Sequence, residues 1–277
     1  MSLDVRERRV AGADLSTSSA RRGSILGWIA IIVGLIAVGI VGASIVGGGE
    51  WSQRESLDPE SAAPTGTRAL ARILAEQGVE VRVVRSHEQA AAELRDGAAT
   101  LVLPDAPALS DDAISALAAP AADVVLIDPR SRTLRLIADG ANAVGVADDA
   151  LVQPQCSVPE AQRAGAIRPR TVFLATDAAQ CYPAAGGFAL LVREAVRSDV
   201  PGTQRVSAVD GAALFTNEHL AEDGNAALAL GLMGRNATLV WYVPSVADTD
   251  LDPASPSLGE LTPPWVSPVI VLMLVAA

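Results

Sequence analysis

The sequence contains no lysine, and it has only two histidines and two cysteines among its 277 residues. The missing lysine argues against a P-loop nucleotide site. Two histidines are too few for a histidine-based metal cluster, and no C-x-x-C or other metal-ligand spacing occurs, so we predict neither a metal nor a cofactor. Nucleic acid is disfavoured as a partner, because 21 arginines face 32 acidic residues and a phosphate backbone requires clustered positive charge.

Half of the residues are apolar and the mean hydropathy is +0.32, which is typical of a chain that folds rather than one that stays disordered. The net charge of −11 is unevenly distributed. Residues 1–23 hold five arginines and three acidic residues, giving +2, whereas the remaining chain carries −13. The two parts therefore face different surroundings.

Residues 24–46 contain no charged side chain. As a helix they would extend about 35 Å, enough to cross a hydrocarbon core of about 30 Å. Arg21 and Arg22 precede this segment, so the positive-inside rule places residues 1–23 in the cytoplasm and the chain after about residue 47 outside. The alternative is a signal peptide cleaved near Ala43, but its apolar region would be unusually long, which favours an uncleaved anchor.

A second uncharged segment, residues 265–277, follows Pro263 and Pro264. We interpret it as the beginning of another transmembrane helix; a buried C-terminal strand is the alternative. The lipid bilayer is thus the predicted partner. The predicted organisation is a cytoplasmic tail (1–23), a transmembrane helix (24–46), a stalk (47–64), an extracytoplasmic domain (65–243), a second stalk (244–264) and the start of a second span (265–277).

The extracytoplasmic segment alternates helical patterns with short apolar runs. This alternation predicts an α/β fold: a doubly wound, flavodoxin-like parallel sheet in the first half, joined by a less regular second half into a mixed sheet with flanking helices. Helices are predicted over residues 65–77, 86–95, 110–118, 131–137 and 225–233. Strands are predicted over residues 79–83, 100–103, 124–127, 171–175, 188–192, 205–209 and 239–242.

Three groups of polar residues are candidates for ligand binding. Asp105 and Asp128 each follow an apolar strand, where they could hold a cation or simply cap the next element. Thr65 and Gly66 open a helix whose free amides suit an anion, although no G-x-G-x-x-G series accompanies them.

The third group is Asn217 and His219, which we place at the carboxyl end of an apolar strand ending at Phe215 and Thr216. Ligand-contacting groups gather at such strand ends in α/β proteins. Alternatively, Asn217 satisfies loop backbone and His219 is a surface residue. Asn225 begins the following helix and is read most simply as its cap.

Cys156 and Cys181 both fall in the predicted extracytoplasmic segment. An oxidising compartment favours a disulfide between them, and two free thiols are the alternative. Closing this loop would stabilise the domain by about 3 kcal/mol.

Taken in order, the segments LDPESAAPTGTRALARILAEQGVEV, LVLPDAP, VVLIDP and LFTNEHLAEDGNAALALGLMG resemble a family of bacterial membrane proteins. Members of that family carry an extracytoplasmic domain of unknown function, similar in fold to class I glutamine amidotransferases, between two transmembrane helices. Amidotransferases use a cysteine nucleophile at a sharp elbow after a strand, and the ends at Asp105 and Asp128 have none. The resemblance therefore implies a fold and a topology, with other envelope membrane proteins or a MoxR-type ATPase system as partners.

These observations favour a non-catalytic membrane protein whose extracytoplasmic domain is a binding or assembly module. One alternative is an extracytoplasmic hydrolase or transferase that uses His219 with Glu218 or Asp223. Another is a ligand sensor that signals through the membrane spans.

Overall fold

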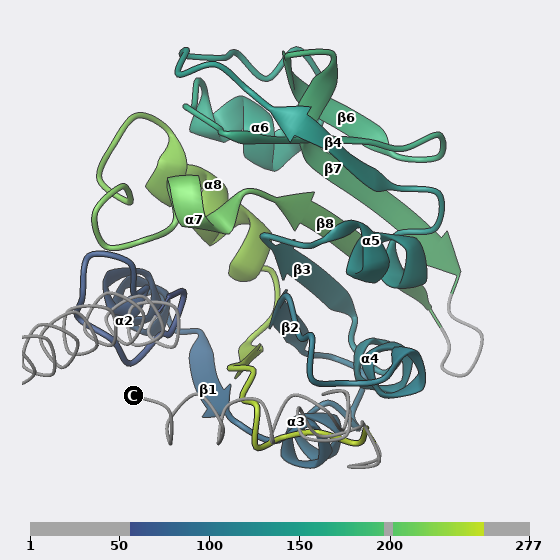
Figure 1. Ribbon diagram of the computed structural model, residues 1–277. Helices are drawn as coiled ribbons and strands as arrows, with labels where there is room; N and C mark the ends of the chain where they lie inside the picture. Colours follow the sequence, from purple (N-terminus) through teal and green to yellow (C-terminus); the bar gives the residue numbers. More distant parts are fainter. Residues whose placement is uncertain (1–55, 197–201, 252–277) are drawn as a thin grey trace, which may run out of the picture. The chain divides into compact units, whose positions relative to one another are not determined.

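A computed structural model describes residues 56–196 and 202–251, and these residues form a nine-stranded sheet (Figure 1). Five neighbouring strands run parallel, and the sheet continues through antiparallel strands with β6 paired to β7 outside the main order. In spatial order the strands are β1 (Glu80–Val84), β9 (Thr238–Tyr242), β2 (Thr100–Pro104), β3 (Asp123–Ile127), β8 (Thr203–Val209), β7 (Gly187–Val196), β5 (Thr171–Leu174) and β4 (Asn142–Val146), with β6 at Ala179–Ala184.

Helices cover both faces of this sheet (Figure 1). One face carries α2 (Arg68–Glu76), α6 (Pro159–Ala164), α7 (Gly211–Leu214) and α8 (Asn225–Met233). The other carries α3 (His87–Glu93), α4 (Asp111–Ala118) and α5 (Ser131–Ile137). Each helical layer encloses its own apolar core.

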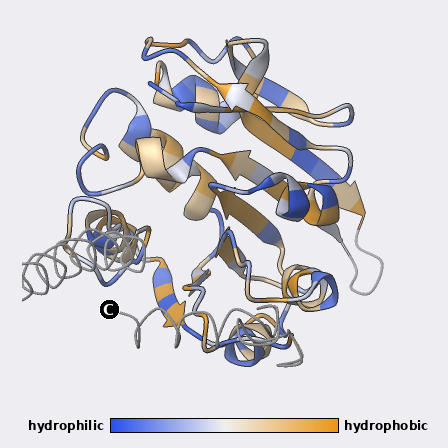
Figure 2. Cartoon of the chain, in the orientation of Figure 1, coloured by the Kyte–Doolittle hydropathy of each residue, from blue (hydrophilic) through white to orange (hydrophobic). Residues whose placement is uncertain are grey.

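The central strands are apolar because both of their faces are covered. Every residue of β2 and β3 is buried. Alternate side chains enter opposite cores: Val102 joins the layer of α2 and α8, while Leu101 and Leu103 join that of α3 and α4. Figure 2 shows this as apolar strands between helices with polar outer faces.

The predicted α/β class and mixed sheet are confirmed. One element was assigned wrongly: residues 211–214 form α7 rather than a strand ending at Phe215 and Thr216. The strand β8 stops at Val209, and the side chain of Asp210 then accepts a hydrogen bond from the Ala213 amide, which starts a helix. The prediction also lacked β4, β6 and α6.

The disulfide between Cys156 and Cys181 is present, with a Cα–Cα distance of 5.2 Å. It joins the segment before α6 to β6. The buried Tyr182 hydroxyl adds a second link by donating to the Ala161 carbonyl at 3.1 Å. This irregular part of the domain is thus fixed both covalently and by a buried hydrogen bond.

A charged network closes the amino ends of the central strands. Glu160 of α6 accepts from Arg205 at 3.0 Å and from Arg235 at 2.8 Å, and Arg235 also pairs with Asp123 at 2.9 Å. Glu160 and Arg205 have side-chain exposures of only 3% and 8%. The pKa of Glu160 is lowered: burial acts to raise it, but a backbone hydrogen bond and the two guanidinium groups outweigh burial.

Both ends of the described domain contact the turn between β1 and α3. At the N-terminal end, Asp58 pairs with Arg85 at 3.0 Å. At the C-terminal end, residues 248–250 form a strap: Asp248 accepts from the His87 amide at 2.7 Å, Thr249 donates to the Ala108 carbonyl at 2.7 Å, and Asp250 accepts from the Ser110 amide at 2.7 Å. The described parts of both predicted stalks therefore pack on the domain.

The predicted spans at 24–46 and 265–277 lie outside the described residues. Within residues 56–196 and 202–251, every helix is too short or too polar to cross a bilayer.

Candidate functional site

Two aspartates stand at the carboxyl ends of adjacent parallel strands. Asp128 follows β3 and Asp210 follows β8, and the preceding residues, Ile127 and Val209, are register partners. The Asp128 amide donates to the Val209 carbonyl at 3.1 Å, which continues the pairing by one step. The sheet thus brings the two carboxyl groups together at the edge where α/β proteins place their ligand sites.

The backbone at Asp128 is strained. Its φ of 50° lies in the left-handed region, which non-glycine residues seldom occupy. The residue forms the sharp turn between β3 and α5, and its Oδ2 accepts from the Ala212 amide at 2.9 Å. Such strain is concentrated at functional sites, where the surrounding structure holds an unfavourable conformation.

Asp210 is only 2% exposed, yet its carboxylate is well satisfied. Oδ2 accepts from the amides of Arg170 at 2.8 Å and Thr171 at 2.5 Å, and Oδ1 accepts from the Ala213 amide at 3.1 Å. Asp210 thereby joins the segment before β5 to the first turn of α7. Three amide donors provide the contacts that a buried carboxylate requires.

Desolvation raises the pKa of Asp128 to about 8, and the charge of Asp210 and a hydrogen bond with that carboxyl act in the same direction. Two opposing effects are smaller, namely hydrogen bonds from the Ala212 and Gly211 amides. Poor solvation and the neighbouring carboxyl group therefore favour the protonated form of Asp128 at neutral pH.

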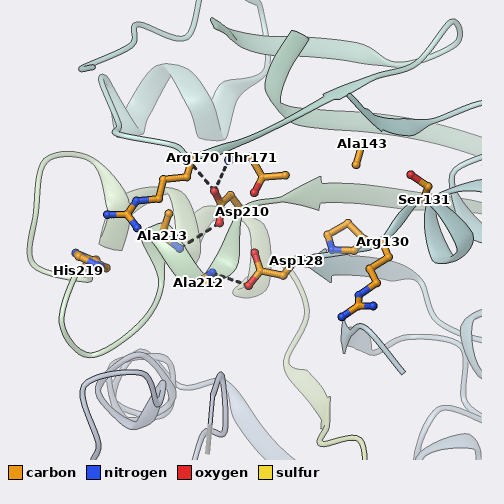
Figure 3. A pocket seen from close by; sticks show the side chains of 11 residues that line it. Asp128, Arg130, Ser131, Ala143, Arg170, Thr171, Asp210, Ala212, Ala213 and His219 are labelled. Atoms are coloured by element: carbon orange, nitrogen blue, oxygen red, sulfur yellow. Dashed lines mark hydrogen bonds between the residues drawn. The ribbon is translucent and has the colours of Figure 1, made fainter. Parts of the chain in front are cut away.

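A cavity of about 560 Å³ opens beside this aspartate pair (Figure 3). This volume is in the range of small-molecule sites. Apart from the two aspartates, its polar lining consists of hydrogen-bond donors and hydroxyl groups. They are Arg130, Ser131, Arg170, Thr171 and His219.

A second cavity of about 520 Å³ shares Arg170, Ala213 and His219 with the first. Its other lining residues are Asp149, Arg168, Glu222 and Asp223. Because three residues line both cavities, the two spaces adjoin along these side chains.

The structure brings Asp128 and His219, two of the predicted candidates, to the same cavity. His219 does not follow a strand, since it comes after α7. Its Nδ1 lies 3.2 Å from Glu222 Oε2, so its contact is with Glu222 and not with the predicted Glu218 or Asp223. Asp105 lines neither of these cavities and instead pairs with Arg130 at 3.2 Å.

The amides near Thr65 and Gly66 are used by the chain itself. Gly66 donates to the Ala63 carbonyl at 3.0 Å, and the Ala69 amide donates to Asn217 Oδ1 at 2.9 Å. Glycine is required at position 66, because a Cβ there would lie 2.3 Å from the Ser61 carbonyl oxygen. This helix start therefore has little capacity left for an anion.

Asn217 and Asn225 bond to loop backbone. Asn217 Nδ2 donates to the carbonyls of Ser61 at 3.0 Å and Ala63 at 2.7 Å. Asn225 Nδ2 donates to the His219 carbonyl at 2.8 Å, whereas its buried Oδ1 has no hydrogen-bond partner within the part of the chain that the structure describes. Asn225 lies one residue inside α8 and makes no capping hydrogen bond, so the predicted cap is wrong; its side chain instead fixes the loop that carries His219.

Sequence reasoning missed Asp210 and Arg170. Asp210, like Asp128, is a polar residue directly after an apolar strand, and this pattern would have identified it. Arg170 precedes an antiparallel strand, and no local pattern distinguishes it from other arginines. Among the described residues, no group of three or more histidine, cysteine, aspartate or glutamate side chains is arranged to hold a metal ion.

Comparison with known proteins identifies the family of this domain. The family model described as a domain of unknown function (DUF4350) matches residues 59–233. The Uncharacterized membrane protein Rv3691 of Mycobacterium tuberculosis (strain ATCC 25618 / H37Rv) is 30% identical over 243 residues, which cover 85% of this chain and 60% of that protein. No solved structure matches the chain. Because the family model spans more than half of its residues, the chain belongs to the DUF4350 family.

Proposed function

We propose that this chain is a membrane protein of the cell envelope whose α/β domain lies outside the cytoplasm and binds a small ligand in the cavity beside Asp128 and Asp210. The relative in Mycobacterium tuberculosis is named a membrane protein, and the uncharged segment 24–46 after Arg21 and Arg22 supports the same location. The Cys156–Cys181 disulfide agrees with an oxidising compartment.

The aspartate pair is the observation that carries the binding role. It combines a strained backbone at Asp128, a carboxyl group that stays protonated near neutral pH, and a cavity of small-molecule size. An acid whose pKa is raised by burial and by a neighbouring charge, beside a cavity of this size, is a candidate binding group.

The strand–turn–helix at Asp128 supports a likeness to class I glutamine amidotransferases, which place their nucleophile at such a turn. Here the turn carries an aspartate, and the described cysteines form the disulfide elsewhere. We therefore propose that the fold is used for binding and not for amide transfer. Other envelope membrane proteins, or a MoxR-type ATPase system, are the proposed partners of the domain.

Thermal-shift screening of the full chain in detergent tests this function. The library contains small carboxylates, phosphates, amines and neutral amides. Ala213 lines both cavities, so Ala213→Trp should obstruct them and abolish the stabilisation by any true ligand. Ala178→Trp, in a separate cavity of about 370 Å³, is the matched control and should retain it. A ligand effect that is unchanged by Ala213→Trp would contradict this location.

A hydrolase or transferase is the second candidate, and the contact between His219 and Glu222 favours it. A carboxylate at 3.2 Å from Nδ1 can orient the imidazole of a general base, and the hydroxyls of Ser131 and Thr171 line the first cavity. Turnover of ester or amide substrates that is lost in His219→Ala, with the melting temperature unchanged, would support catalysis over binding alone.

A further inference from the structure

Arg170 differs from the other arginines that line the two cavities. Arg130 is paired with Asp105 at 3.2 Å, and Arg168 is paired with Asp223 at 3.1 Å. The guanidinium of Arg170 has no ion-pair partner among the described residues, although it lines both cavities. It is therefore the cation available to a ligand there.

The backbone of Arg170 is nevertheless held firmly. Its amide donates to Asp210 Oδ2 at 2.8 Å, and its carbonyl accepts from the Ala147 amide at 2.5 Å. Asp210 contacts Arg170 through the backbone and leaves the guanidinium free. In Figure 3 the side chain extends away from Asp210 toward the side where His219 lies. A fixed backbone lowers the ordering cost of placing this cation against a ligand.

Most of the carboxyl groups that line the two cavities are already engaged. Of the two carboxyl groups at the strand ends, Asp128 favours its protonated form at neutral pH, and the oxygens of Asp210 accept three amide hydrogen bonds. In the second cavity, Asp223 is paired with Arg168 and Glu222 contacts His219, whereas Asp149 has no ion-pair partner among the described residues. Much of the nearby negative charge is thus engaged, whereas the positive charge of Arg170 is not.

Resting on the proposed binding function, we propose that the ligand is held through an anionic group, a carboxylate or a phosphate, which pairs with the guanidinium of Arg170 where the two cavities adjoin. The planar guanidinium can donate two parallel hydrogen bonds to either group. His219 lines the same junction and offers an additional polar contact. The rest of the ligand extends into the first cavity toward Thr171 and Ser131.

Arginine modification of the full chain in detergent tests this assignment. Phenylglyoxal attacks accessible guanidinium groups, and mass spectrometry of the digested chain gives the rate at each arginine. The reaction is run with inorganic phosphate, with acetate, or with sodium chloride of equal ionic strength. Arg95 is the internal control, since it is exposed and has no ion-pair partner among the described residues.

We expect phosphate or acetate to slow the reaction of Arg170 but not that of Arg95. The slowing should reach about tenfold at an anion concentration of about ten times its dissociation constant. Protection by one anion alone identifies the group. Equal rates at Arg170 in all three salts, or equal protection of Arg95, would overturn the assignment.

A melting experiment separates failure of this inference from failure of the proposed function. In Arg170→Gln, stabilisation by phosphate or acetate should disappear, whereas Arg95→Gln, outside both cavities, should retain it. If neutral or amine fragments stabilise the protein and lose this effect in Ala213→Trp, while anions have no effect, the binding function stands and the anionic ligand is wrong. If no fragment depends on Ala213, the binding function itself fails.

Discussion

Replacing Asp128 by asparagine should make the protein more stable at neutral and alkaline pH. The amide of asparagine has the shape of a protonated carboxyl group. It can donate to Asp210 and accept from the Ala212 amide, as Asp128 does in its protonated form. It avoids the cost of keeping an acid protonated in the folded state.

The size of the effect follows from the pKa of Asp128, which is 3.8 in its ordinary setting and about 8 in the folded domain. At pH 7 the unfolded chain has released this proton and the folded chain has kept it. The pH is then about three pKa units above the unfolded value, and each unit corresponds to about 1.4 kcal/mol. Keeping the proton in the folded state therefore costs at most about 4 kcal/mol, which Asp128→Asn should recover.

The direction with pH is equally defined. Between pH 4 and 8 the folded state binds one more proton at Asp128 than the unfolded state does, so the contribution of this group to stability falls as the pH rises. This contribution is largest below the pKa of the unfolded state, and it is lost as the pH rises through the folded-state pKa of about 8. Asp128→Asn should remove this slope.

Chemical denaturation of the full chain in detergent, followed by circular dichroism from pH 5 to 9, measures both effects. Asp105→Asn is the matched control at the end of a neighbouring strand; it breaks the ion pair with Arg130 and should bring no gain in stability. The reasoning is refuted if Asp128→Asn is no more stable than the parent chain at pH 8, or if it keeps the same pH dependence.

Four further changes test other parts of the domain. Glu160→Gln should lower the free energy of unfolding by about 3–5 kcal/mol, because it removes the buried carboxylate that pairs with Arg205 at 3.0 Å; a loss below about 1 kcal/mol would contradict this. The stabilisation by Glu160 should also fade as the pH drops below about 4.5, because its folded pKa is lowered. Reducing the Cys156–Cys181 disulfide should cost about 3 kcal/mol, seen as a lower melting temperature, and an unchanged temperature would refute it. Asn217→Ala should lower the free energy of unfolding by about 2–3 kcal/mol, because two loop carbonyls and one amide lose their hydrogen-bond partner. His219→Ala should leave the melting temperature unchanged. Equal losses of stability in both variants would show that His219 is structural.

The parallel half of the fold was predictable because its signals are local. A strand covered on both faces must be apolar throughout, and β2 and β3 are such runs. The antiparallel half was harder to predict. The edge strand β4 is mostly exposed and rich in small residues, so neither an apolar run nor a strict alternation marks it.

In the candidate site, the position of each aspartate along the chain was predictable, but their proximity was not. Asp128 follows a recognisable strand, and so does Asp210, but their proximity depends on β3 and β8 being neighbours. The intervening chain of about 80 residues gives no sign of that pairing in the sequence. The strain at Asp128 and the missing partner of Arg170 are likewise properties of the folded domain alone.

The two ends of the domain meet at one turn, and this has a mechanical consequence. Asp58 forms an ion pair with Arg85, and Asp248 accepts a hydrogen bond from the amide of His87, which is two residues after Arg85. Tension that pulls the two ends apart would load these contacts, and those of Thr249 and Asp250 to the loop between β2 and α4, before it reached β3 and β8. The strands that position Asp128 and Asp210 should therefore keep their pairing under such tension.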